Sequence, residues 1–282
     1  MSAFFSWKFL QGFLTASVMA YVGFIVLLFL LQRVMMYLPP KLEPSELTSL
    51  LNSYEPISVV TEDGLKISGF FTPPIDTQKP IIIAFHGNAS HPAWQSYKFK
   101  GLVEKGYGIL LAEYRYYGGN PGKPSEDGFY KDARAYINAK PLLETYKNNP
   151  LILYGQSLGS GVAVQLASDY PERASGIVLE VPYDTMVNVA KKHYPFVIGM
   201  KYLLKDKFMS VEKVDKLTMP KLFILAGRDE VVGFKSGSRL YDASPEPKDL
   251  IVFELASHNQ LPLEKIQEEL EYFCESITGE KK

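Results

Sequence analysis

The stretch LILYGQSLGSGVAVQLA, residues 151–167, contains the change of pattern that decides the fold. It opens as a short continuous apolar run, typical of a strand covered on both faces, and continues with the spacing of a helix. Gly155 and Gly159 flank Ser157 in the pattern G-x-S-x-G, which permits a sharp strand-to-helix turn with an exposed serine Oγ. The alternative is an ordinary strand–turn–helix, so a nucleophilic serine must also have partners elsewhere in the chain.

Further short apolar runs divide the chain from residue 80 onward into strand-length pieces. Helix-length segments lie between them, as at residues 94–106 and 128–149. This alternation predicts an α/β fold, in which right-handed crossovers build a mostly parallel sheet with helices on both faces. The predicted strands occupy residues 80–87, 107–114, 151–155, 176–182, 222–227 and 250–255.

Three other segments add detail to the predicted domain, which spans residues 54–282. Residues 57–73 read as two strands joined at Asp63-Gly64, the signal of a two-residue hairpin turn. Residues 113–128 are rich in glycine and proline and predict a rigid loop beside the site. Residues 183–220 are longer than a plain crossover needs, and predict a short lid insertion.

The first 38 residues predict a membrane anchor. Gln11 is the only strongly polar side chain from Phe9 to Leu31, a stretch long enough to cross a bilayer as a helix. A cleaved signal peptide would have a shorter apolar region and a small-residue cleavage site, whereas LLQRVMMYLPP follows here. We therefore expect a single-pass protein with an anchor at residues 1–38 and a tether at 39–53. Basic residues flank both ends of the span, so charge leaves its orientation open.

Composition excludes several classes of function. A formal net charge of -1 and 46% apolar residues give no electrostatic surface for nucleic acid. Cys274 is the single cysteine, which excludes an intrachain disulfide and a thiol–metal cluster. The chain also lacks the residue spacing of a zinc protease helix or a phosphate-binding loop. We expect neither a metal nor another cofactor.

A serine hydroxyl needs a base, and the base needs a group that fixes its tautomer. His258 follows the last predicted strand, and Asp229 follows the strand before it. The chain order Ser157, Asp229, His258 is the order found where a G-x-S-x-G serine is catalytic. Each residue taken alone has another explanation: His258 could be a solvated loop histidine, and Asp229 could be a turn residue. Glu230 is the alternative to Asp229 as the acid.

The negative oxygen of a tetrahedral intermediate needs two N–H donors. Leu158 supplies one, because it follows the serine at a helix N-terminus, and Asn88 is the candidate for the second, in the loop after the strand at 80–87. His86 is expected to pack this loop rather than act as a base. His193, with the two lysines before it, is either a contact for anionic lipid head groups or a solvated basic patch.

Six motifs together resemble the α/β-hydrolase superfamily, in particular its membrane-anchored serine hydrolases, which include depalmitoylases and relatives of serine aminopeptidases. The resemblance covers residues 55–275 and implies Ser157 as nucleophile, Asp229 as acid and His258 as base. It also implies Asn88 and Leu158 as oxyanion donors. The depalmitoylating members have an acylated, cysteine-rich amino terminus, and this chain differs by its apolar helix. The motifs are FHGNA, YRYYGGNPGKPSEDG, GQSLGSGVA, PYDTMVNVAKKHYP, RDEVV and SHN.

The sequence therefore predicts a membrane-anchored serine hydrolase that cleaves a carboxylic ester or thioester through an acyl-enzyme. Its location beside a bilayer favours lipophilic acyl substrates. Two alternatives stay open: an amide hydrolase like the serine aminopeptidases, and a membrane-tethered binding module without turnover.

Overall fold

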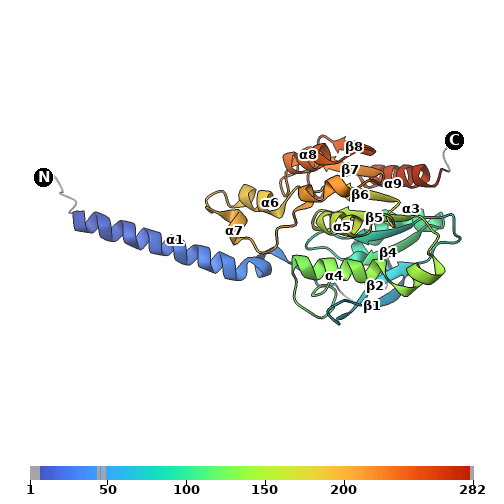
Figure 1. The fold of residues 1–282 in the computed structure, drawn as a ribbon, viewed down its shortest axis with the longest axis horizontal. Helices are drawn as coiled ribbons and strands as arrows, with labels where there is room; N and C mark the ends of the chain where they lie inside the picture. Colours follow the sequence, from blue (N-terminus) through green and yellow to red (C-terminus); the bar gives the residue numbers. More distant parts are fainter. Residues whose placement is uncertain (1–6, 43–44, 46–48, 280–282) are drawn as a thin grey trace.

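The chain folds into an α/β domain from which one long helix projects (Figure 1). The structure is a computed structural model and describes residues 7–42, 45 and 49–279. The predicted tether, residues 39–53, therefore falls partly outside the described residues. The strands are β1 Glu55–Val60, β2 Lys66–Thr72, β3 Ile81–Phe85, β4 Gly108–Ala112, β5 Leu151–Gln156, β6 Gly176–Glu180, β7 Lys221–Ala226 and β8 Lys248–Phe253. The α-helices are α1 Trp7–Met36, α3 Pro92–Glu104, α4 Glu126–Ile137, α5 Leu158–Asp169, α6 Met186–His193, α7 Met200–Leu203, α8 Phe234–Ala243 and α9 Leu263–Thr278. Short helical turns are η1 Pro141–Thr145, η2 Ser210–Glu212 and η3 Val214–Lys216.

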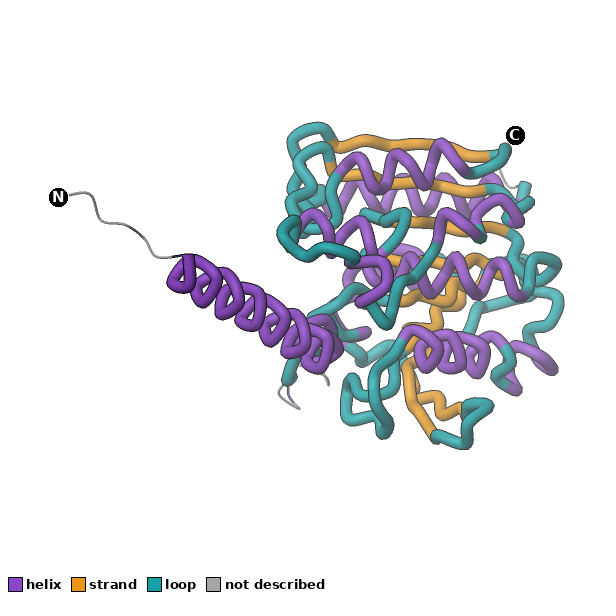
Figure 2. Tube along the Cα trace, turned by 60° about the vertical axis from the view of Figure 1, so that its left-hand side comes forward, coloured by secondary structure: helices purple, strands orange, loops and turns teal. Residues whose placement is uncertain are grey.

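The strands form one eight-stranded sheet in the order β1-β2-β4-β3-β5-β6-β7-β8. The six strands from β4 to β8 in this order are parallel, and β1 and β2 add an antiparallel edge. Helices α3 and α9 cover one face, and α4, α5 and α8 cover the other (Figure 2). All five residues of β3, IIIAF, are buried, as expected of a central parallel strand. The predicted fold class is confirmed.

The β1–β2 hairpin has a longer turn than the sequence predicts. Val60 pairs with Lys66, and the backbone N–H of Thr61 donates to the carbonyl of Leu65. The turn closes through the Thr61 side chain, whose Oγ1 donates to Asp63 and accepts from the N–H of Leu65. The prediction of a two-residue turn at Asp63-Gly64 was therefore wrong. The Thr61 hydroxyl accepts the N–H of Leu65, a group that a two-residue turn would pair with a backbone carbonyl.

The lid region, residues 183–220, contains α6, α7, η2 and η3 and lies between β6 and β7. The second half of α1 packs against α6 and α7, a contact that the sequence analysis did not predict. Three α1 side chains make polar contacts there. Tyr21 donates to the carbonyl of Phe196, Gln32 donates to that of Leu203, and Arg33 forms a bidentate ion pair with the buried Asp206.

Candidate active site

Ser157 stands at the turn between β5 and α5 with φ 50° and ψ −116°. A positive φ is uncommon for a residue with a Cβ, and such strain is held by the surrounding structure. The Ser157 N–H donates to the carbonyl of Glu180 on the neighbouring strand at 2.9 Å. Glu180 is itself fixed, because its carboxylate accepts from Lys98 Nζ at 2.6 Å. The serine backbone is thus tied to the neighbouring strand β6 of the sheet.

Both glycines of the G-x-S-x-G pattern are required by close backbone approach. A Cβ on Gly155 would lie 2.5 Å from the carbonyl oxygen of Gly159, and a Cβ on Gly159 would lie 2.1 Å from that of Phe85. Real Cβ atoms do not approach a carbonyl this closely, and the Phe85 carbonyl in the central strand β3 cannot move away. Helix α5 can therefore begin this near the sheet only with glycine at these positions.

The variant Gly159→Ala is expected to lower the free energy of unfolding by about 3 kcal/mol, the upper part of the range for an overpacked site. Gly101→Ala in α3 is the matched control, because a Cβ there meets nothing within 4 Å and alanine is the better helix former. Thermal unfolding should show a lower Tm for Gly159→Ala and a slightly higher Tm for Gly101→Ala. Equal Tm values for the two variants would contradict the close-approach argument.

The structure brings Ser157, His258 and Asp229 into one hydrogen-bonded line. His258 Nε2 lies 2.9 Å from Ser157 Oγ, and His258 Nδ1 lies 2.7 Å from Asp229 Oδ2. His258 and Asp229 are both buried. The two nitrogen atoms of the imidazole thus face a hydroxyl on one side and a carboxylate on the other. This arrangement lets the ring accept the serine proton while the carboxylate stabilises the resulting charge.

The second oxygen of Asp229 is bound by the backbone that follows it. Asp229 Oδ1 accepts from the N–H groups of Val231, Val232 and Gly233 at 2.9, 2.8 and 3.1 Å. Burial raises the pKa of the Asp229 carboxyl, but the hydrogen bonds from His258 and the backbone lower it more, so the pKa is below its ordinary value. Asp229 is therefore ionised at neutral pH and oriented with one oxygen toward the imidazole.

Glu230, the alternative acid, contacts the histidine in a different way. Its Oε2 accepts from the backbone N–H of His258 at 3.2 Å, and its side chain has no hydrogen bond to the imidazole. The two acids thus contact different parts of His258: Asp229 contacts the imidazole ring, and Glu230 contacts the main chain.

The basic segment of α6 holds the loop of Asp229. Lys192 Nζ donates to the carbonyls of Asp229 and Glu230, and His193 Nε2 lies 2.7 Å from the carbonyl of Val231. The sequence analysis considered a head-group contact or a solvated patch for these residues. Lys192 and His193 are exposed, as a solvated patch predicts, and their side-chain nitrogens also contact backbone carbonyls of the Asp229 loop. The head-group contact stays a prediction.

Both candidate oxyanion donors lie beside Ser157. Leu158 is the first residue of α5, and a Cβ on Gly87 would lie 3.4 Å from Ser157 Cβ, so the loop before Asn88 passes directly beside the serine. In the described part of the chain, the backbone N–H groups of Leu158 and Asn88 have no protein acceptor. Two N–H groups on either side of the serine can therefore receive a developing oxyanion.

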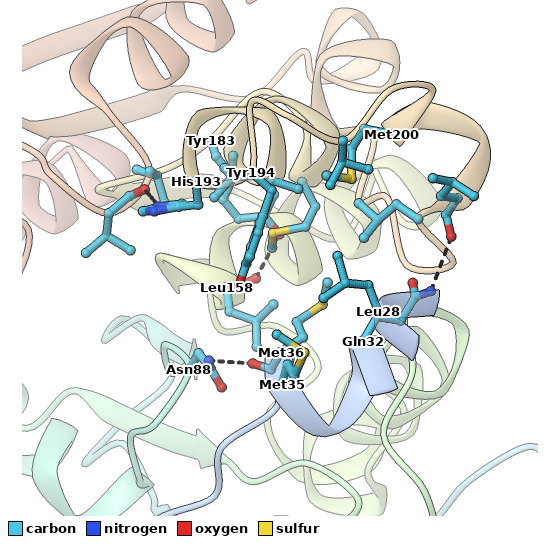
Figure 3. Close-up of a pocket in the computed structure, with 18 of the residues that line it drawn as sticks. Leu28, Gln32, Met35, Met36, Asn88, Leu158, Tyr183, His193, Tyr194 and Met200 are labelled. Carbon is cyan, nitrogen blue, oxygen red and sulfur yellow. Dashed lines mark hydrogen bonds between the residues drawn. The ribbon is translucent and has the colours of Figure 1, made fainter. Parts of the chain in front are cut away.

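The Asn88 side chain joins this loop to the end of α1. Its Nδ2 donates to the carbonyl of Met36 at 2.6 Å (Figure 3). Its Oδ1 accepts from the N–H of Leu38 at 3.1 Å. Tyr117 also donates to Oδ1, at 2.7 Å. The membrane-type helix is thus bonded to a residue of the candidate oxyanion loop, a link that the sequence pattern did not indicate.

His86 is buried beneath the same loop, as expected. Its Nε2 lies 2.8 Å from Glu113 Oε1, and its Nδ1 lies 2.7 Å from the carbonyl of Gly87. His91 also approaches the Glu113 carboxylate, at 3.4 Å, and caps the N-terminus of α3. These side chains fix the loop from below, and the sequence analysis missed the acid that joins the two histidines.

A cavity of about 550 Å³ opens from Ser157 between the lid and α1 (Figure 3). Its lining is mostly apolar, and six α1 residues contribute to it: Ile25, Leu28, Phe29, Gln32, Met35 and Met36. The lid contributes the facing wall, with Tyr194 and Met200 among its side chains. Sequence reasoning missed the α1 wall, since nothing in a uniformly apolar helix marks the face that adjoins a catalytic domain.

No group of three or more His, Cys, Asp or Glu side chains that could hold a metal ion occurs within residues 7–42, 45 and 49–279.

The comparisons with known proteins agree on one fold family. A model of the alpha/beta hydrolase fold family matches residues 80–202. The uncharacterized protein Rv2307c of Mycobacterium tuberculosis is 32% identical over 241 residues, which cover 84% of each protein. Alpha/beta hydrolase domain-containing protein 17B of Xenopus laevis is 31% identical over 208 residues, covering 72% of this chain and 68% of that protein. A solved structure of a Pyrococcus furiosus esterase is 20% identical, with a TM-score of 0.65, and covers 86% of this chain and 96% of its own.

The chain belongs to the α/β-hydrolase family. Several of its structural neighbours are esterases, and the likeness to them is one of fold.

Proposed function

We propose that the protein is a membrane-anchored serine hydrolase that cleaves a carboxylic ester or thioester through an acyl-enzyme. The observation that carries this proposal is the hydrogen-bonded line from Asp229 through His258 to Ser157, together with the apolar cavity that Ser157 lines. The Pyrococcus furiosus esterase has the same fold, which agrees with the proposal.

The geometry accounts for each step of the proposed reaction. Ser157 Oγ attacks the acyl carbon while His258 Nε2 takes its proton, and Asp229 stabilises the imidazolium. The N–H groups of Asn88 and Leu158 bind the oxyanion. His258 then protonates the leaving alcohol or thiol, and a water molecule hydrolyses the acyl-enzyme by the same route in reverse.

The cavity indicates the substrate class. Leu28, Met35 and Met36 form one side of it and Val197 and Met200 the other, so the acyl group would be surrounded by hydrocarbon and thioether atoms. Burial of each methylene of an acyl chain contributes about 0.8 kcal/mol. A lipophilic acyl group is therefore the expected substrate, in preference to the short polar groups of an aminopeptidase substrate.

The test is release of nitrophenol from esters of graded acyl length, from acetyl to palmitoyl, beside a peptide anilide. The wild type should prefer medium to long acyl esters, and the Ser157→Ala variant should be inactive. Preference for the anilide would favour the aminopeptidase alternative. Equal rates for the two proteins on every substrate would favour a binding module.

The anchor is also expected to stay attached. Helix α1 has one stretch, Phe9–Met36, that is long and apolar enough to span a membrane, and its last turns bind Asn88 and Asp206. Cleavage as a signal sequence would remove a wall of the cavity. Intact-mass measurement of the protein extracted from membranes should therefore give a chain that still contains residues 9–36, and a mature chain beginning after residue 36 would overturn this proposal.

A further inference from the structure

The lid ends in an exposed apolar tip. We use lid tip for residues 194–204, which connect α6 to the end of α7. Phe196, Ile198 and Tyr202 project from it, and the Ile198 side chain is 81% exposed. None of the three lines the cavity. Exposed large apolar side chains gathered in one short segment mark a surface that meets something other than water.

The lid tip is fixed beside the middle of α1. The hydroxyl of Tyr21 donates to the carbonyl of Phe196 at 3.0 Å and accepts from the N–H of Ile198 at 3.2 Å. The rings of Phe24 and Phe196 lie 6.0 Å apart, centroid to centroid. One tyrosine side chain therefore satisfies two backbone groups of the lid tip, which a loop placed among lipid tails would otherwise leave unpaired.

The position of these contacts along α1 determines how deep they would lie in a bilayer that the helix crosses. About 20 helical residues cross the hydrocarbon layer of a bilayer. The apolar stretch Phe9–Met36 has 28 residues, so about 20-residue windows within it run from 9–28 to 17–36. Every such window contains residues 17–28, and therefore Tyr21 and Phe24. The lid tip that contacts them is at hydrocarbon depth wherever the span begins.

Polar contacts define the opposite, interfacial end. Gln32 binds the backbone of Leu203 and Lys205, and Arg33 pairs with Asp206. Lys205 Nζ lies 4.3 Å from the centroid of the Phe29 ring. A cation above an aromatic ring at the end of an apolar span is typical of a side chain that reaches toward the membrane surface. Both the lid and α1 thus become more polar toward the C-terminal end of the apolar stretch of α1.

The cavity also runs along α1. Ile25 and Leu28 line its outer end and belong to the stretch that every window contains, whereas Met36 lines its inner end near Ser157. Eleven residues separate Ile25 from Met36, which is about 16 Å along a helix axis. The reacting serine is therefore at interfacial depth, and the cavity extends from it toward the lipid tails.

We propose that the lid tip inserts into the same hydrocarbon layer that α1 crosses, and that the acyl chain of a membrane lipid enters the cavity directly from this layer. The second half of this statement rests on the proposed hydrolase function. The ester or thioester of such a lipid lies at the membrane surface, level with Ser157. Hydrolysis consumes one water and returns a fatty acid to the layer and an alcohol or thiol to the aqueous side.

Insertion is tested independently of activity by a depth-sensitive label. Ile198→Cys would carry the environment-sensitive fluorophore NBD in phosphatidylcholine vesicles that contain nitroxide-labelled phosphatidylcholine. Cys274 does not compete for the label, because it is buried and burial raises the pKa of its thiol. Leu143→Cys is the control, since this exposed residue follows the end of α4 that points away from α1 (Figure 1).

Nitroxides placed along the acyl chain should quench the label at position 198 at least about threefold more than the label at 143. Equal, weak quenching at both positions would overturn the insertion of the lid tip, whatever the activity of the protein. The measurement needs no substrate, so it gives a result even if the protein proves to be a binding module.

Entry from the membrane is tested by activity on two kinds of ester. Ile198→Asp places a charge in the hydrocarbon layer, which is costly at that depth. This variant should hydrolyse a long-chain ester carried in vesicles about tenfold more slowly than wild type. Its rate on nitrophenyl acetate in solution should stay within about twofold of the wild-type rate. Leu143→Asp should match wild type on both.

Equal loss on both esters would contradict a portal role, because it would mean a damaged site. Unchanged activity on the vesicle-borne ester would show entry by another route. If wild type itself hydrolyses neither ester, the proposed function fails while the quenching result still decides the insertion.

Discussion

Replacing Ser157 with alanine is expected to lower kcat/KM on the preferred ester by about 10⁵-fold or more, because loss of the nucleophile of a catalytic triad has an effect of this size. Alanine retains the backbone contacts of the turn, namely the N–H bond to Glu180 and the carbonyl that accepts from Ser160. The variant should therefore unfold at nearly the same temperature as wild type. The kinetic measurement is nitrophenol release under conditions where wild-type turnover is linear.

A fluorophosphonate probe provides the matching chemical readout, since it labels only an activated serine. Wild type should be labelled at Ser157, and the alanine variant should not be labelled at all. Ser160, three residues later and buried, is the internal control for nonspecific labelling; its hydroxyl donates to the Ser157 carbonyl. A folded wild-type protein that is neither labelled nor active would instead support the binding-module alternative.

Local patterns were sufficient to predict the parallel part of the sheet. Its inner strands read as continuous apolar runs because they are covered on both faces, and β3 with its five buried residues is the clearest case. The turn at Ser157 was also predictable, because glycine on each side is demanded by backbone contacts within 2.5 Å. The β1–β2 turn was not, since the Thr61 hydroxyl replaces the hydrogen bond that defines a two-residue turn.

Only the part of the candidate site that lies at the ends of strands could be predicted from the sequence. Parallel strands place their carboxyl ends at one edge, which brings Ser157, Asp229 and His258 to the same region from three different loops. The wall provided by α1 depends on how the helix is rotated against the lid. That rotation is set by tertiary contacts, such as the Arg33–Asp206 pair, between residues 173 positions apart. No local pattern reports contacts at this separation.

The link between Asn88 and Met36 gives helix α1 a structural role beyond the proposed anchoring. A helix that only tethered the domain would need no bond to the loop beside the serine. Here the last carbonyl of α1 and the N–H of Leu38 bind the two polar atoms of one amide group. The position of the candidate oxyanion loop is thus coupled to the position of α1.

Asp229→Asn is the second variant with a large expected effect, a loss of about 10⁴-fold in kcat. The asparagine oxygen can still accept from the N–H groups of residues 231–233, so the loop should keep its shape. Its amide nitrogen would then face His258 Nδ1 and donate to it. The imidazole would be held in the tautomer with a proton on Nε2, which cannot accept the proton of Ser157.

Glu230→Gln is the matched control, because it changes the neighbouring residue in the same way. Glu230 binds only the main chain of His258, and glutamine can accept the same N–H bond. Its loss in kcat should stay below about tenfold, the range of one exposed hydrogen bond. The comparison of the two variants assigns the acid, since a larger loss for Glu230→Gln than for Asp229→Asn would make Glu230 the triad member and refute the assignment of Asp229.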